Sequence, residues 1–290
     1  MKISMSTEVA LTRMTDSLDE AANVMKQAGF DGIDISMCDD QLDPEKQALP
    51  QWKEKIVAEA DAVKKAGLEI AQCHLPYFPG HIKKPGDGGY MAYEAFCLPG
   101  VIRAVELCGE IGCPVAVLHP YYDETDADNC IEGNVHMVKA LIPYLEKHHV
   151  KLALENIYCH QYEMSNVSYP EQIMKILNMV DHPLVGTCLD TGHANVFGID
   201  CAQAVRTYGK KLFALHANGN SHRRLTDNHV IPGVMGDGID YLAFASALKE
   251  VGYTGWFNLE IGSGTLPAAA VPAFYALAAA VARELAKMAE

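Results

Sequence analysis

Short apolar runs alternate along the chain with longer segments in which apolar side chains recur every three or four residues. The short runs are typical of buried parallel strands, and the periodic segments are typical of helices that pack one face on a core. The runs fall at residues 2–6, 29–36, 68–75, 114–120, 151–156, 184–189, 212–218 and 256–261. Eight alternating units predict a (β/α)8 TIM barrel, an α/β fold that forms a single domain over residues 1–290.

Capping residues support this alternation. Gly29, Gly67 and Gly112 each end a periodic segment just before an apolar run, and Ser17 and Glu20 have the spacing of a capping box. The helices are expected near residues 18–28, 52–63, 101–111, 135–148, 171–180, 202–208, 241–251 and 271–285. A Gly/Pro-rich segment at 76–89 is too long for a tight connection, so it is a candidate lid or substrate loop, with an exposed insertion as the simpler alternative.

The segment 184–200, LVGTCLDTGHANVFGID, changes abruptly from apolar to polar at Asp190. In a parallel barrel the carboxyl ends of the strands carry the chemistry, so Asp190 and His193 are expected to point into a shared mouth. Gly192 is expected to let the backbone turn between them. Taken alone, the segment fits equally well a helix that Asp190 or Thr191 caps, with His193 on the surface.

Five further predicted strands also end in a side chain that can bind a metal. Together with Asp190 the residues are His74, His119, Glu155, His216 and Glu260. If the strands close into a barrel these groups converge, and carboxylates in one dry pocket repel each other unless a cation neutralises them. Three carboxylates and one imidazole, Glu155, Asp190, His216 and Glu260, suit one divalent ion, Mn2+ first, with Mg2+, Co2+ or Zn2+ as alternatives.

Composition and charge limit the binding partners and the cellular location that are expected. The formal charge of −14 argues against a broad basic surface for nucleic acid. Nine scattered cysteines without a CxxC pair, and no signal-peptide run, favour reduced thiols and a cytoplasmic protein. The uncharged run 266–282 contains Pro267 and Pro272, so a packed final helix is expected and not a membrane span.

Several motifs carry a family resemblance over nearly the whole length. They are LALEN with Glu155, CLDTGHAN with Asp190 and His193, LHANGN with His216, DNHVIPGVMGDGIDY with Asp227 and His229, and WFNLEIG with Glu260. In this order they resemble the xylose isomerase-like barrels, in the branch of sugar phosphate isomerases and epimerases. The resemblance implies a sugar or sugar phosphate substrate, one divalent metal on Glu155, Asp190, His216 and Glu260, and a substrate contact by His193. A homo-oligomer is an open option.

The expected chemistry is proton transfer beside a carbonyl. A metal bound to the carbonyl and a neighbouring hydroxyl stabilises the enediolate that forms when the adjacent carbon loses its proton. Glu155 and Glu260 would then act as base and acid, giving epimerisation or aldose–ketose isomerisation. The candidate substrate contacts are His74, His119, His193, His229 and Arg223, although an exposed loop is the simpler interpretation of Arg223.

Other functions on the same fold stay open. The zinc-dependent apurinic endonuclease IV family uses nine ligands, and this chain has the corresponding types at His74, His119, Glu155, Asp190, His193, His216, Asp227, His229 and Glu260. Against it stand the acidic charge, the ANGN sequence after His216 and the departure of LEIGSG from the final nuclease motif. A keto-inositol dehydratase and a non-catalytic sugar-binding barrel are the remaining alternatives.

Overall fold

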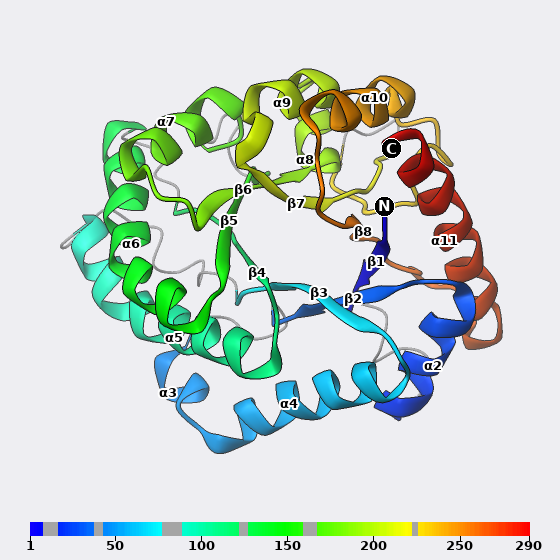
Figure 1. Cartoon of the computed structure of the whole chain (residues 1–290), viewed down its shortest axis with the longest axis horizontal. Coiled ribbons are helices and arrows are strands. Elements are labelled where there is room, and N and C mark those ends of the chain that lie inside the picture. Colours follow the sequence, from blue (N-terminus) through cyan, green and yellow to red (C-terminus); the bar gives the residue numbers. More distant parts are fainter. Residues whose placement is uncertain (8–16, 38–42, 77–88, 122–126, 159–166, 222–225) are drawn as a thin grey trace.

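Eight parallel strands form a ring whose neighbours follow the chain order (Figure 1). The computed structural model describes residues 1–7, 17–37, 43–76, 89–121, 127–158, 167–221 and 226–290. The strands are β1 (Ile3–Ser6), β2 (Gly32–Ser36), β3 (Glu69–His74), β4 (Val115–Leu118), β5 (Lys151–Glu155), β6 (Val185–Asp190), β7 (Leu212–His216) and β8 (Phe257–Leu259). A parallel bridge between Ala217 and Leu259 joins β7 to β8, so the sheet closes and the predicted barrel is confirmed.

Helices surround the strands on the outside of the ring (Figure 1). They are α2 (Leu18–Ala28), α3 (Pro44–Gln47), α4 (Pro50–Lys65), α5 (Gly89–Ile111), α6 (Ala127–His148), α7 (Pro170–Val180), α8 (Thr191–Val196), α9 (Cys201–Tyr208), α10 (Tyr241–Val251) and α11 (Val271–Met288), with short 3-10 turns η2 (Gly209–Lys211) and η3 (Ala268–Ala270). Helices α5 and α6 begin earlier than predicted. In α5 the pair Pro99–Gly100 signals a helix break, yet the helix continues through it and packs on α6.

The predicted caps of α2 are present. Ser17 has an extended backbone and its Oγ accepts a hydrogen bond from the Glu20 N–H at 3.4 Å. Gly29 adopts a left-handed conformation with φ of 105°, where its N–H bonds to the last carbonyls of the helix. These caps fix the point at which α2 turns into β2.

The inner face of the barrel has an apolar half and a polar half. Val117, Ala153, Cys188 and Ala214 from β4 to β7 form one packed cluster. The strands β1, β2, β3 and β8 instead contribute buried polar side chains: Ser4, Asp34, Gln72 and Asn258. The main apolar core lies on the other side of the sheet, between strands and helices, with Ile3, Met5, Ile33 and Ile35 among its members. A buried polar half is costly unless its groups bond to one another.

Two register shifts aim side chains into the barrel. The pairing of β2 with β3 shifts between Ile33 and Asp34, so that Asp34 lies opposite Gln72. The pairing of β6 with β7 shifts between Thr187 and Cys188, so that Asp190 lies opposite His216. An extra residue in one strand of a pair re-aims the side chains that follow it.

The final helix packs on the barrel as predicted. By length and composition 268–288 is long and apolar enough to cross a membrane. In this fold α11 contacts α2, α10, β1 and β8. Its buried side chains are Val271, Tyr275, Ala278, Ala279, Ala282, Leu285 and Ala286.

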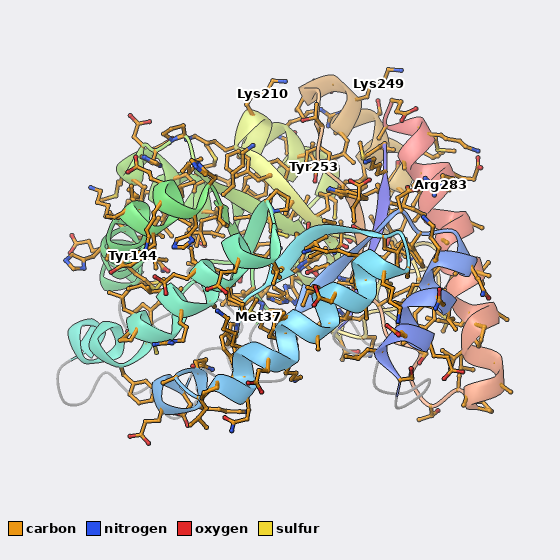
Figure 2. The ribbon with its side chains drawn as sticks, turned by 60° about the horizontal axis from the view of Figure 1, so that its bottom comes forward. Met37, Tyr144, Lys210, Lys249, Tyr253 and Arg283 are labelled. Carbon is orange, nitrogen blue, oxygen red and sulfur yellow. The ribbon has the colours of Figure 1, made fainter. Side chains whose placement is uncertain are left out.

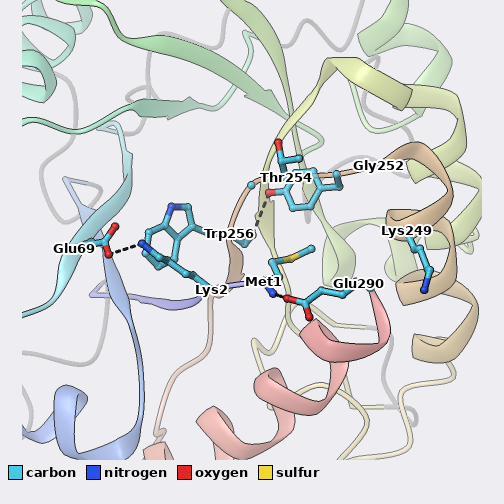
Figure 3. A pocket seen from close by; sticks show the side chains of 11 residues that line it. Met1, Lys2, Glu69, Lys249, Gly252, Thr254, Trp256 and Glu290 are labelled. Carbon is cyan, nitrogen blue, oxygen red and sulfur yellow. Dashed lines mark hydrogen bonds and ion pairs between the residues drawn. The ribbon is translucent and has the colours of Figure 1, made fainter.

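A pocket of about 630 Å3 lies at the amino-terminal end of the strands, beside both chain termini (Figure 3). Lys2 pairs there with Glu69 at 2.5 Å, and the terminal amine of Met1 pairs with Glu290. These four charged groups are therefore paired with one another, whereas the residues singled out in the sequence lie at the opposite ends of the strands.

Seven cysteines are described, and all are buried free thiols. Cys73, Cys108 and Cys113 lie together on the outer side of β3 and the end of α5. Cys38 and Cys159 lie outside the described residues.

Candidate active site

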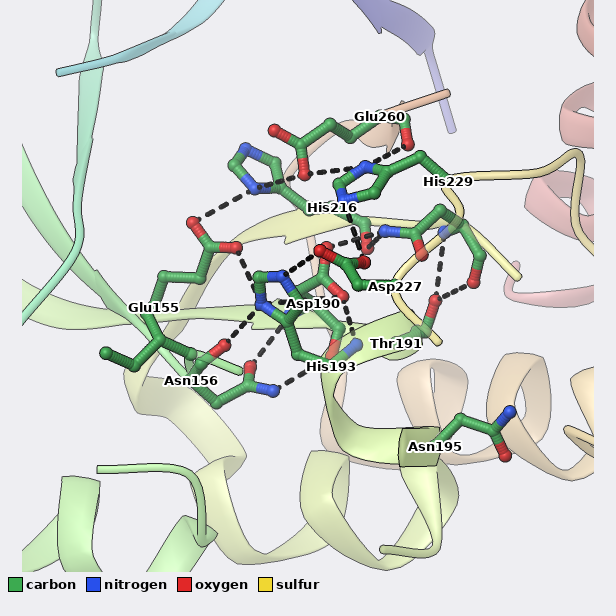
Figure 4. A network of polar contacts seen from close by, with 12 residues as sticks. Glu155, Asn156, Asp190, Thr191, His193, Asn195, His216, Asp227, His229 and Glu260 are labelled. Carbon is green, nitrogen blue, oxygen red and sulfur yellow. Dashed lines mark hydrogen bonds and ion pairs between the residues drawn. The ribbon is translucent and has the colours of Figure 1, made fainter. Parts of the chain in front are cut away.

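The six side chains predicted to converge meet at the carboxyl ends of the strands. His74, Glu155, Asp190 and His216 are the last residues of β3, β5, β6 and β7, while His119 and Glu260 directly follow β4 and β8. Figure 4 shows the central part of this group, drawn from β5, β6, β7 and the segments that follow β5 to β8. The convergence expected from the strand ends is present.

His216 lies at the centre of the cluster and is fully buried. Its Nδ1 is 3.1 Å from Glu155 Oε2 and 3.2 Å from Glu260 Oε2. Burial alone would lower the pKa of His216, but the surrounding acidic groups, among them Cys188, Glu155 and Glu260, raise that pKa well above its usual range. Burial likewise opposes ionisation of Glu155, yet His216 and His119 hold the pKa of Glu155 well below its usual range. Glu155 and His216 therefore favour each other's charged form, an ionised carboxylate beside a cationic imidazole.

His74 bridges the two glutamates. Its Nε2 lies 3.4 Å from Glu155 Oε2, and its Nδ1 lies 3.3 Å from Glu260 Oε1. His119 places its Nε2 3.4 Å from the same Glu155 oxygen. The His119 side chain is 21% exposed whereas His74 is 1% exposed, so His119 lies nearer the open side of the cluster. Their predicted role as substrate contacts stays a prediction.

Asp190 caps a helix and also belongs to the cluster, so the predicted cap is present, whereas a surface position for His193 is wrong because its side chain is buried. Its Oδ1 accepts from the N–H of His193 at 2.6 Å at the start of α8, and its Oδ2 accepts from Asn218 Nδ2 at 2.6 Å. The Asn156 side chain bonds to both the N–H and the carbonyl of Asp190. Burial raises the pKa of Asp190. These bonds fix the carboxylate in one orientation.

The expected role of Gly192 is wrong. Gly192 lies inside α8, and the described left-handed glycines do not include it, so it makes no turn. A Cβ at this position would lie 1.9 Å from Asn218 Oδ1. Glycine is required because the Asn218 side chain passes directly over the backbone on its way to Asp190.

A second polar group lies beside the first. His193 Nδ1 donates to the Asn156 carbonyl at 2.8 Å, and His229 Nδ1 donates to the Glu260 carbonyl at 3.0 Å. Both rings consequently turn Nε2 toward Asp227, at 3.4 and 2.9 Å. Burial would lower the pKa of His229, but Asp227 and Glu260 raise it to about 10. His193 also connects the two groups, since its Nδ1 is 3.4 Å from Glu155 Oε1.

Some positioning residues were not identified from the sequence. Asn156 and Asn218 each follow a strand and could have been found as polar residues next to Glu155 and His216 in the motifs LALEN and LHANGN. Asp34 carries a fainter signal, a single acid within the apolar run GIDIS. Arg223 and the loop segment 77–88 lie outside the described residues, so their predicted roles stay predictions.

The donor set fits a divalent metal ion. Within the described part of the chain, both oxygens of buried Glu155 and both ring nitrogens of His216 lack a hydrogen bond of regular geometry. Ligand atoms of His74, His216 and Glu260 lie within 4.8 Å of one another, as do those of His74, His119 and Glu155. A buried carboxylate that faces an imidazole, with neither in a regular hydrogen bond, is an arrangement that a bound cation would satisfy.

Comparison with known proteins gives the same fold. The profile of a family described as xylose isomerase-like TIM barrel matches residues 22–286. Inosose isomerase of Bacillus subtilis (strain 168) is 29% identical over 163 residues, which make up 54% of this chain and 57% of that enzyme. The match therefore spans little more than half of the length of that relative.

Two solved structures superpose along nearly the whole chain. One is 3-keto-D-glucoside 4-epimerase from E. coli, with 18% identity and a TM-score of 0.71, covering 98% of this chain and 99% of that chain. The other is D-psicose 3-epimerase with D-tagatose from Clostridium cellulolyticum H10, with 16% identity and a TM-score of 0.75 over 98% and 99%. At these identities the likeness establishes the fold.

Proposed function

Because the chain belongs to the xylose isomerase-like TIM barrel family, we propose that it is a divalent-metal-dependent isomerase or epimerase of a sugar or sugar phosphate. The observation that carries the proposal is the placement of Glu155 and Glu260 against one nitrogen of His216, at 3.1 and 3.2 Å. The similarity to an inosose isomerase and to two sugar epimerases supports the same reaction class.

Glu155, Asp190, His216 and Glu260 would hold the metal ion, with Mn2+ as the first choice for an oxygen-rich set. When bound, the ion would polarise the carbonyl of the sugar and so acidify the neighbouring C–H. The ionisation of Glu155 favours binding of the metal ion. Burial opposes its charge, but the lowered pKa of Glu155 keeps the carboxylate ionised at neutral pH.

Glu155 and Glu260 would carry the proton. A carboxylate on one side of the substrate carbon removes its proton, and a carboxylic acid on the other side returns one. If the proton is returned to the same carbon from the opposite face, the configuration of that carbon is inverted. If the proton is returned to the neighbouring carbon, a ketose becomes an aldose. Both glutamates are at most 3% exposed, so the transfers would take place in a site shielded from bulk water, and the carboxyl protons would exchange with solvent between turnovers.

The histidines would bind hydroxyl or phosphate oxygens of the substrate. Backbone carbonyls hold His193 and His229 at Nδ1, so that the Nε2 atoms of both rings face Asp227. The His119 ring is partly exposed, so it would meet a ligand that enters from the open side of the cluster. The fixed ring orientations favour hydrogen bonding to a small polar ligand.

Solvent-deuterium exchange tests this function directly. The Mn2+-loaded protein is incubated in D2O with ketoses, ketose phosphates and inososes, and each sugar is analysed for deuterium beside the carbonyl. At least one substrate should gain deuterium, and chelation of the metal should stop the exchange. Absence of exchange across the panel would contradict the proposal.

A second candidate, a zinc-dependent endonuclease for abasic DNA, has one observation in its favour. Eight of the nine candidate ligands fall into three groups among the described residues, one of them His193, Asp227 and His229 with ligand atoms within 4.8 Å of one another. The charge of −14 opposes binding to a DNA backbone. Efficient incision of an abasic-site duplex by the zinc-loaded protein would favour this candidate over the sugar isomerase.

A further inference from the structure

A buried carboxylate lies directly behind the central histidine. Asp34 Oδ2, from β2, is 3.2 Å from His216 Nε2, and both residues have no solvent exposure. His216 thus has an acid at each end of its ring: Asp34 at Nε2 on the barrel interior side, and Glu155 and Glu260 at Nδ1 on the site side. Asp34 touches none of the other clustered histidines or acids in the described contacts.

Two side-chain amides fix the orientation of Asp34. Gln72 Nε2 donates to Asp34 Oδ2 at 3.0 Å, and Asn258 Nδ2 donates to the same oxygen at 2.9 Å. Gln72 is further held by the Leu215 carbonyl at 3.3 Å, and Asn258 Oδ1 accepts from Ser4 Oγ at 2.7 Å. Three strands besides β2 therefore converge on one carboxylate oxygen.

This arrangement dictates where the proton of His216 sits. Asp34 Oδ2 accepts hydrogen bonds from the side-chain amides of Gln72 and Asn258. His216 Nε2 faces the same oxygen, so Nε2 must carry a proton for that contact to be favourable. A metal ion that binds at Nδ1 would displace the proton of the cationic ring there, and in the neutral imidazole that results Nε2–H leaves the lone pair on Nδ1. That lone pair points at the position between Glu155 and Glu260.

We propose that Asp34 is a positioning residue that holds His216 in the Nε2–H tautomer and thereby directs its Nδ1 lone pair at the divalent metal ion. The inference rests on the proposed function, because it concerns the same metal ligand. A carboxylate behind a ligating histidine fixes the ring and raises its basicity, and loss of such a partner commonly weakens metal binding by about 10-fold to 100-fold.

The proposed role of Asp34 in holding His216 also explains why half of the barrel interior is polar. An interior in which apolar side chains replaced this acid and its three donors together would cost less to bury. The register shift beside Asp34 sets it opposite Gln72, which supplies one of those donors. Asp34, Gln72, Asn258 and Ser4 are thus one supporting layer beneath the site.

Metal titration of two matched variants tests the inference. Asp34→Asn keeps the shape and still offers an oxygen to the amides, but removes the negative charge behind His216. Ser4→Ala is the control, because it breaks a hydrogen bond of the same layer, that to Asn258, without touching Asp34. The dissociation constant for Mn2+ is measured by calorimetry on metal-free protein, and the visible absorption of Co2+-loaded protein reports the ligand geometry.

Asp34→Asn should raise the Kd for Mn2+ by about 10-fold to 100-fold and change the Co2+ absorption, while Ser4→Ala leaves both at wild-type values. Should Asp34→Asn fail to fold by circular dichroism, Gln72→Met removes one donor to Asp34 and should raise the Kd in the same direction by a smaller factor. A folded Asp34→Asn protein, or Gln72→Met protein in its place, with the wild-type Kd would overturn the inference alone. Wild-type protein that binds no divalent ion would overturn the proposed function and the inference together.

Discussion

Glu155 and Glu260 each place a carboxylate oxygen beside the same atom, Nδ1 of His216, although Glu155 ends β5 and Glu260 follows β8, two strands that are not neighbours in the sheet. His74 contacts both glutamates from another side, at 3.4 and 3.3 Å. A cation at this position would reduce the repulsion between two nearly fully buried acids. The pair of glutamates is therefore the centre from which the predictions follow.

The protein should bind about one divalent ion per chain, and His216 should be essential for it. His216→Ala removes the ligand that both glutamates face, so the metal content of purified, Mn2+-equilibrated protein should fall to near zero by elemental analysis. His182→Ala is the control, because its ring pairs with Glu146 away from the site. Close to three zinc ions per wild-type chain would instead favour the nuclease candidate.

Gly192 and Asn218 should be strongly coupled in stability. Gly192→Ala would press its Cβ against Asn218 Oδ1, so it should lower the free energy of unfolding by about 1–3 kcal/mol. In an Asn218→Ala background that clash is absent and the same substitution should cost less. Urea unfolding of the four proteins measures the coupling, and additive changes would contradict the described contact.

Asp31 should stabilise the fold in a pH-dependent way. Burial raises its pKa, but hydrogen bonds from Arg283 and the Ile3 N–H outweigh this and lower the pKa of Asp31 below its usual 3.8. Arg283, on the outer helix α11 (Figure 2), bonds to Asp31 Oδ2 at 2.7 Å and to the Gly29 carbonyl at 2.6 Å. The two side chains are 33% and 35% exposed, so Asp31→Asn should cost only about 0.5–1 kcal/mol at neutral pH.

The sign of the pH effect follows from the lowered pKa. The contribution is fully present above the unfolded pKa and is lost as the pH falls through the lower folded pKa. The stability difference between wild type and Asp31→Asn should thus be constant above about pH 5 and shrink below about pH 4 in denaturant titrations. Asp61→Asn, at an exposed position of α4, is the control. A difference that grows on acidification would contradict the described ion pair.

The sequence predicts the barrel and the meeting of the six strand-end side chains, because period and strand ends are local features. It does not reveal the register shifts that set Asp34 beside Gln72 and Asp190 beside His216, since these depend on pairing between strands. Gly192 shows the same limit: a turn is the local explanation of a glycine, whereas the actual reason is a side chain from the segment after β7. The starts of α5 and α6 were missed because packing outweighs local breaking signals.

The most direct measurement of the central claim is deuterium transfer by a single variant. Glu260→Gln keeps the shape of the side chain but cannot accept or give the proton, so it should abolish the solvent-deuterium exchange of the substrate found with wild-type protein. Circular dichroism should show an unchanged fold, and Glu250→Gln, at an exposed position of α10, should retain wild-type exchange. A folded Glu260→Gln protein that still incorporates deuterium at the wild-type rate would contradict the assignment of proton transfer to this glutamate.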